Sequence, residues 1–114
     1  MERILIDLNK TPGIQGCFLV DSDGIIILSD FATDVNDEMM GALASSIINT
    51  TSKVVEKLNH GELQSFTFET DKSKLFFNNT KAGFLVAVTS PDANIGLIRM
   101  EMKSASEKIN NISL

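Results

Sequence analysis

Residues 16–29, with the sequence GCFLVDSDGIIILS, decide the fold of this chain. Two apolar runs, residues 16–20 and residues 25–29, flank the turn-forming residues 21–24 (DSDG). Gly24 can adopt the positive φ that closes a tight hairpin, so the pattern predicts two consecutive antiparallel strands. Because both runs are apolar throughout, we expect both faces of both strands to be buried.

Helical patterns lie on both sides of this hairpin and at the end of the chain. Upstream, apolar residues recur at helical spacing until residues 11–13 (TPG) end the helix. Downstream, Asp34 and Asn36 are candidate N-caps of a long helix that runs to about Asn59. A last helix begins after residues 91–94 (PDAN), and its apolar stripe consists of Ile98, Met102, Ala105, Ile109 and Ile112.

Three further strands are predicted between the two long helices. Residues 63–70 (LQSFTFET) alternate in polarity, which is typical of a partly solvated strand at a sheet edge, and residues 74–79 and 84–89 follow. The order is helix, strand, strand, helix, strand, strand, strand, helix. It implies an α+β fold, a three-layer α/β/α domain with a five-stranded antiparallel sheet, over residues 1–114.

Composition narrows the classes of function. The 114 residues are 43% hydrophobic and 22% charged, which indicates one globular domain, and the net charge of −5 disfavours nucleic acid as a partner. The apolar runs are far shorter than the roughly 20 residues of a membrane-spanning helix, so no integral membrane segment is expected. The lone Cys17 and an Asp7 that interrupts any signal peptide favour the cytoplasm.

The long central helix carries the most informative pattern. One side has large apolar residues at spacings of three and four, which we expect to lie on the sheet: Met40, Leu43, Ile47, Val54 and Leu58. The other side has no charge from residue 39 to residue 52 and carries Gly41, Ala42, Ser45, Ser46 and Asn49. Small side chains let another backbone come close, so we expect a two-fold dimer interface there. The alternative is an ordinary water-facing surface.

The predicted edge strand fits the same dimer. Its unpaired hydrogen-bonding groups would invite aggregation, and pairing with the same strand of a second copy would remove that edge. Phe66 and Phe68 would then anchor the seam.

No arrangement of residues indicates catalysis, a metal or a cofactor. His60 and Cys17 are each the only residue of their type, and no phosphate-binding glycine signature is present. Residues 21–24 resemble part of a calcium loop, but Leu19 occupies the first ligand position. We therefore expect no metal, no cofactor and no enzymatic activity.

Two motifs resemble the roadblock family. Residues 11–24 (TPGIQGCFLVDSDG) are similar to its opening, in which a first helix precedes a PGI.G..LVD.DG hairpin. Residues 91–99 (PDANIGLIR) are similar to its NxGLxR entry into the last helix, and the element order agrees along the chain. That family includes dynein light chains, scaffold subunits that hold Rag-type GTPases, and prokaryotic MglB-type regulators of Ras-like GTPases.

The resemblance implies a homodimer, or a heterodimer of related chains, whose central helices pack together and whose third strands join two sheets. It also implies a non-enzymatic adaptor that regulates or scaffolds a small Ras-like GTPase by ordering its switch loops. Gly24 would be the hairpin glycine and Gly96 the close-packing glycine of the last helix. The acids Asp34, Asp37 and Glu38 are candidates for the GTPase-facing surface. A donated arginine is not expected, because both arginines lie in predicted helices.

A small-molecule sensor module remains the alternative function. Such modules share the three-layer architecture, but they need a cavity in which several polar groups converge. The sequence patterns identify no such polar set.

Overall fold

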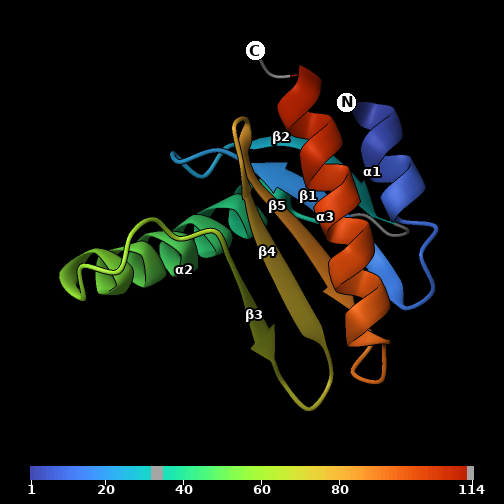
Figure 1. The fold of residues 1–114 in the computed structure, drawn as a ribbon. Helices are drawn as coiled ribbons and strands as arrows, with labels where there is room; N and C mark the ends of the chain where they lie inside the picture. Colours follow the sequence, from blue (N-terminus) through green and yellow to red (C-terminus); the bar gives the residue numbers. More distant parts are fainter. Residues whose placement is uncertain (32–34, 113–114) are drawn as a thin grey trace.

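The computed structural model describes residues 1–31 and 35–112, and its element order is the predicted one (Figure 1). The elements are α1 (Glu2–Leu8), β1 (Ile14–Val20), β2 (Ile26–Phe31), α2 (Asp37–Lys57), β3 (Ser65–Glu69), β4 (Lys74–Thr80), β5 (Gly83–Thr89) and α3 (Ile95–Ile112). The strands form one sheet in the order β2-β1-β5-β4-β3, and every neighbouring pair is antiparallel. The predicted α+β fold with a five-stranded antiparallel sheet is confirmed.

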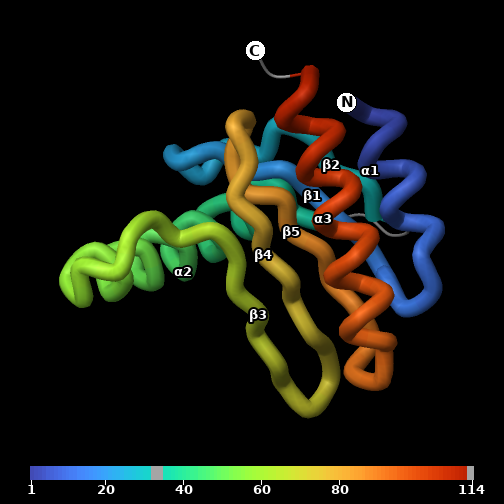
Figure 2. The backbone as a smooth tube through the Cα atoms, in the orientation of Figure 1, coloured from blue at the N-terminus to red at the C-terminus, as the bar shows by residue number. Residues whose placement is uncertain are grey.

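The helices cover the two faces of the sheet unequally. Helices α1 and α3 lie side by side on one face, and α2 lies on the other and extends past the sheet (Figures 1 and 2). On the α3 side, the predicted stripe is confirmed, since Ile98, Met102, Ala105 and Ile109 are at most 5% exposed. Ile112, at the helix end, is instead 56% exposed.

The first hairpin forms as predicted, but its two strands differ in burial. Strand β1 is buried on both faces from Cys17 to Val20. Gly24 takes a φ of +84°, and the Asp21 carboxylate accepts hydrogen bonds from the turn. The expectation that both faces of the second apolar run are buried is wrong, because Ile25, just before β2, is 60% exposed and Ile27, within β2, is 40% exposed. Strand β2 is the edge of the sheet, where the helical layers give less cover.

Side chains cap the two long helices at their first turns. The Asn36 Oδ1 accepts a hydrogen bond from the Met39 N–H at 3.0 Å, which confirms this predicted cap. The Asn94 Oδ1 accepts from the Leu97 N–H at 3.1 Å in the same way at α3. The other candidate cap, Asp34, lies outside the described residues.

Helix α2 is seated on the hairpin through two glycines. A Cβ atom on Gly41 would overlap the carbonyl oxygen of Gly24, so the two backbones touch directly. A Cβ on Gly24 would lie 3.3 Å from the Gly41 oxygen and from the Ser45 Cβ. Gly41 is therefore covered by its own chain, and its place in a dimer interface stays a prediction.

The contact between Gly41 and Gly24 predicts that alanine at position 41 destabilises the protein, although alanine favours helices. Gly41→Ala should lower the free energy of unfolding by about 1–3 kcal/mol through overpacking, although alanine is the better helix former by about 1 kcal/mol. Ser46→Ala, on an exposed side of the same helix, should change it by less than about 0.5 kcal/mol. Urea unfolding of both variants measures the difference. An unfolding free energy of Gly41→Ala equal to or above that of the native chain would contradict the contact.

Candidate interaction surface

Helix α2 turns a different side toward the sheet from the one that its large apolar residues predict. The buried positions are Gly41, Ala44 and Ile48. The expectation that Leu43, Val54 and Leu58 lie on the sheet is wrong, because these side chains are 54–62% exposed. The glycine contact with the hairpin fixes the rotation of the helix, so the side with Gly41, Ala44 and Ile48 faces the sheet.

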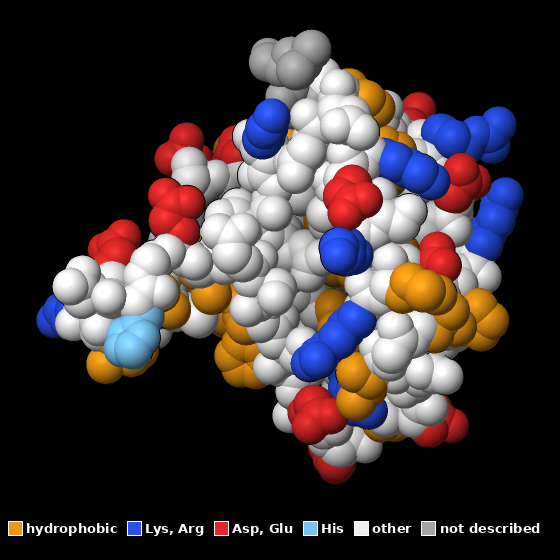
Figure 3. All heavy atoms as spheres, in the orientation of Figure 1, with side chains coloured by type: hydrophobic (Ala, Val, Ile, Leu, Met, Phe, Trp, Pro, Cys, Tyr) orange, Lys and Arg blue, Asp and Glu red, His pale blue; other side chains and the backbone are white. Residues whose placement is uncertain are grey.

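The displaced large residues form an exposed apolar stripe along α2. The stripe consists of Met39, Leu43, Val54 and Leu58, and each of them is more than half exposed. Met40 and Ile47, at its inner margin, are half-buried against the core. Figure 3 shows hydrophobic side chains along this side of the projecting helix and below it. An exposed row of large apolar residues marks an interaction surface more often than a water-facing one.

A row of aromatic rings lies at the sheet edge, on the same face as α2. The Phe66 ring stacks on the buried Phe77 ring, with centroids 4.4 Å apart and planes 8° from parallel. The Phe68 ring approaches Phe66 and Phe77 edge-on, and Phe68 is 42% exposed. Strand β3 ends the sheet, as predicted, so these rings border an open strand edge.

The small polar residues of α2 are divided between two environments. Ala42 and Ser46 are exposed. Ser45 and Asn49 are hydrogen-bonded to each other at 3.3 Å and line a pocket of about 210 Å³ between α2 and the turns of the chain. Phe84 lines the same pocket from β5. The structure therefore places Ser45 and Asn49 over the chain's own turns, and Ala42 and Ser46 on the open side.

The remaining candidate residues lie apart from this surface or at its margin. Asp37 and Glu38 are exposed in the first turn of α2, and Asp34 is outside the described residues. Gly96 is exposed in the first turn of α3, and a Cβ there would meet only the Asn94 Oδ1, at 3.4 Å. The expectation that Gly96 provides close packing is wrong within this chain.

The one cysteine is a core residue. Cys17 is fully buried, and its Sγ donates to the Leu5 carbonyl oxygen at 3.4 Å. Burial, aided by the negative charge of Asp30, raises the pKa of the Cys17 thiol to about 12, so the thiol is neutral at physiological pH. Residues 1–31 and 35–112 contain no group of three His, Cys, Asp or Glu side chains placed to hold a metal ion. No helix within those residues is long and apolar enough to span a membrane.

Comparison with known proteins places this architecture in a family. A family model of the Roadblock/LC7 domain matches residues 1–90. The chain belongs to the Roadblock/LC7 domain family. An uncharacterised protein of Methanocaldococcus jannaschii, MJ1340, is 36% identical to this roadblock chain over 109 residues, which is 96% of each chain.

Solved structures share the fold of this roadblock chain. MglB of Myxococcus xanthus matches with a TM-score of 0.91 at 20% identity, over 97% of this chain and 92% of MglB. A structure described as MglB with a tetrameric arrangement matches with a TM-score of 0.87 at 18% identity, over 97% and 85% of the two chains. The predicted membership of the roadblock family is confirmed, and the interface residues within it stay predictions.

Two features of the surface were missed by reasoning from the sequence. Leu43, Val54 and Leu58 follow the helical period, but the period alone places them on the sheet, and it does not include Met39. The grouping of Arg99 with polar residues of β3 and β4 was also missed, because it depends on which strand lies beside α3. The period of the helix was available as a signal for the stripe, but nothing local marked the second grouping.

Proposed function

We propose that this roadblock protein is a non-enzymatic homodimeric adaptor that binds a small Ras-like GTPase and regulates or scaffolds it. Membership of the Roadblock/LC7 domain family carries the proposal. The motifs of this chain resemble that family, and the resemblance implies a GTPase regulator or scaffold. The tetrameric arrangement described for one structural neighbour supports self-association.

The exposed surfaces of the chain support a two-fold contact between copies. The apolar stripe of α2 and the Phe66–Phe68 edge lie on the same face of the sheet. A second copy related by a two-fold axis would present the same stripe and the same edge. Each stripe would then be covered by the partner subunit. Pairing of the two β3 edges would satisfy their free backbone groups. Ala42 and Ser46, beside the stripe, belong to this proposed interface.

The regulatory mechanism we propose is conformational. A rigid dimer that binds the switch loops of a GTPase in one nucleotide state more tightly than in the other shifts the population toward that state. Asp37 and Glu38 are exposed acids at the start of α2 and are the proposed contacts with the GTPase. A donated arginine plays no part, since Arg3 and Arg99 both lie within helices.

Binding to nucleotide-loaded GTPases tests this function. The protein should bind at least one small Ras-like GTPase from its own genome, with an affinity that differs at least about fivefold between the GDP and GTP-analogue states, about the smallest coupling of typical allosteric systems. Isothermal titration calorimetry on both loaded forms measures this difference. Equal affinity for both nucleotide states of every such GTPase, or no binding to any of them, would refute the proposal.

A double variant and a control variant test the proposed contact of Asp37 and Glu38 with the GTPase. Asp37→Asn combined with Glu38→Gln should weaken GTPase binding about threefold to tenfold, as expected for charges at an interface rim. Glu107→Gln, an exposed charge on α3, should leave the affinity unchanged. Because acids in a first helical turn also stabilise the helix by about 0.3–1 kcal/mol each, thermal unfolding must be recorded for both variants. Loss of binding that follows from partial unfolding alone would count against the contact.

A further inference from the structure

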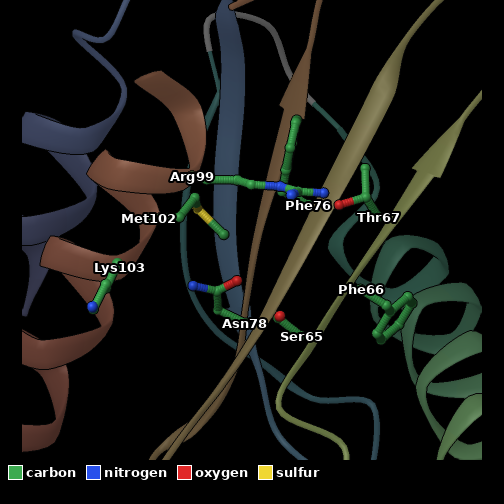
Figure 4. A pocket seen from close by; sticks show the side chains of 8 residues that line it. All are labelled: Ser65, Phe66, Thr67, Phe76, Asn78, Arg99, Met102 and Lys103. Carbon is green, nitrogen blue, oxygen red and sulfur yellow. The ribbon is translucent and has the colours of Figure 1, made fainter. Parts of the chain in front are cut away.

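A pocket of about 350 Å³ lies between α3 and the strands β3 and β4, on the face of the sheet opposite α2. The alternation of β3 explains its character, since successive side chains point to opposite faces. Figure 4 shows the Phe66 ring turned away toward α2 and the Thr67 side chain facing Arg99. Ser65 and Thr67 therefore give this pocket a hydroxyl wall.

The residues across the pocket from this hydroxyl wall are fixed by packing and hydrogen bonds. Phe76 and Met102, at 2% and 1% exposure, form an apolar floor. The Asn78 Nδ2 donates to the Ser106 Oγ at 3.2 Å, and that hydroxyl donates to the Met102 carbonyl oxygen at 2.7 Å. The Asn78 amide is thus fixed by α3, with its oxygen on the side away from that hydrogen bond (Figure 4).

The charge of the pocket is positive in a chain whose net charge is −5. Arg99 and Lys103 line it from successive turns of α3, and none of the lining residues is Asp or Glu. Within residues 1–31 and 35–112 the ion pairs are Lys10–Asp7 and Lys74–Glu69, so neither pocket cation is paired there. The Arg99 guanidinium extends across the pocket toward Thr67, and the Lys103 ammonium points outward at the rim (Figure 4).

We propose that this pocket binds the phosphate group of a small phosphorylated molecule. The planar Arg99 guanidinium can donate to two phosphate oxygens at once, and the Ser65 and Thr67 hydroxyls supply donors from the facing strand. Lys103, on a flexible stem, adds charge at the rim. The Asn78 side-chain oxygen accepts a hydrogen bond from a hydroxyl of the ligand. The volume of the pocket suits a small molecule. The site is complete within one chain and does not depend on the proposed GTPase adaptor function.

Titration with small anions, followed by backbone amide NMR, tests the site. Inorganic phosphate and glycerol 3-phosphate should both shift the amide signals of Thr67, Asn78 and Arg99, with the ester binding more tightly because of its hydroxyls. Affinity for glycerol 3-phosphate should rise from pH 5 to pH 7.5, since a phosphate monoester loses its second proton near pH 6 while arginine stays charged. Equal shifts in sodium chloride of matched ionic strength, or acetate binding as tightly as phosphate, would overturn the proposal.

Charge-neutralising variants distinguish phosphate binding in the pocket from non-specific attraction of anions to α3. Arg99→Gln should weaken phosphate binding at least about tenfold, as expected for loss of a charge-assisted pair, and Lys103→Gln should weaken it less. Lys108→Gln removes the same charge from α3 outside the pocket and should leave the affinity within about twofold. Arg99 is exposed, so circular dichroism should show the native fold in all three variants. Native-like phosphate affinity of folded Arg99→Gln would overturn the proposal.

Discussion

Leu43→Glu combined with Val54→Glu should give a folded monomer in place of the proposed dimer. The two side chains are 57% and 54% exposed in the single chain, so the charged replacements meet water and leave the fold intact. In the proposed dimer they are covered, and a buried carboxylate without a partner is strongly unfavourable. If the two changes each cost the interface about 2 kcal/mol, the dissociation constant rises by about 1,000-fold or more.

Sedimentation or light scattering measures the outcome directly. The mass should fall from twice to once the 12.4 kDa of the chain, while the circular dichroism spectrum keeps its native shape. The matched control is Met100→Glu combined with Ile112→Glu on α3, since these apolar residues are 61% and 56% exposed and lie outside the proposed interface. A native chain that is already monomeric, or a dimer that survives the α2 changes, would remove the proposed interface.

A second double variant tests whether the proposed interface extends beyond the stripe to Ala42 and Ser46. Ala42 and Ser46 are exposed beside the stripe, and the sequence pattern assigns them to the dimer contact. Ala42→Glu combined with Ser46→Glu should therefore also produce a folded monomer. Light scattering that shows an unchanged dimer for this pair, beside a monomer for the Leu43 and Val54 pair, would confine the interface to the stripe and contradict the prediction for Ala42 and Ser46.

The sequence predicted well those features that depend on residues near one another in the chain. The hairpin glycine Gly24, the caps Asn36 and Asn94, and the buried stripe from Ile98 to Ile109 are all set by local spacing. Local hydrogen bonding and helical periodicity act within a few residues, so one sequence carries the whole signal.

The features that sequence reasoning placed wrongly are decided by distant contacts. The apolar period identified α2 as a helix, but the contact of Gly41 with Gly24 decides which side faces the sheet. Likewise, the apolar run of β2 is ambiguous until pairing puts that strand at the edge, where Ile27 is exposed. A helix or strand can be recognised locally, but its rotation and its neighbours depend on the tertiary structure.

Proline at two adjacent positions of β3 should have opposite consequences, because the backbone groups of an edge strand alternate in direction. The Asn79 N–H donates to the Gln64 carbonyl oxygen at 2.7 Å, and Phe66 lies opposite Phe77 in the same register. Residues 64, 66 and 68 therefore bond to β4, and residues 65, 67 and 69 point their backbone groups to the open side. Thr67→Pro removes only an outward N–H, and proline is tolerated on edge strands.

Thr67→Pro should accordingly give a folded protein whose dimer is about tenfold weaker or more, because the proposed β3 seam loses a hydrogen bond from each copy. Phe66→Pro should unfold the chain, since it removes a bond to β4 and the ring that stacks on Phe77. Thr67→Val keeps the N–H and should keep the dimer, which separates the backbone effect from loss of the hydroxyl. Sedimentation measures the dimer affinity of the three variants, and thermal unfolding measures their stability. Because the apolar stripe is untouched in all of them, an undiminished Thr67→Pro dimer would mean that copies associate through the helices without joining their sheets.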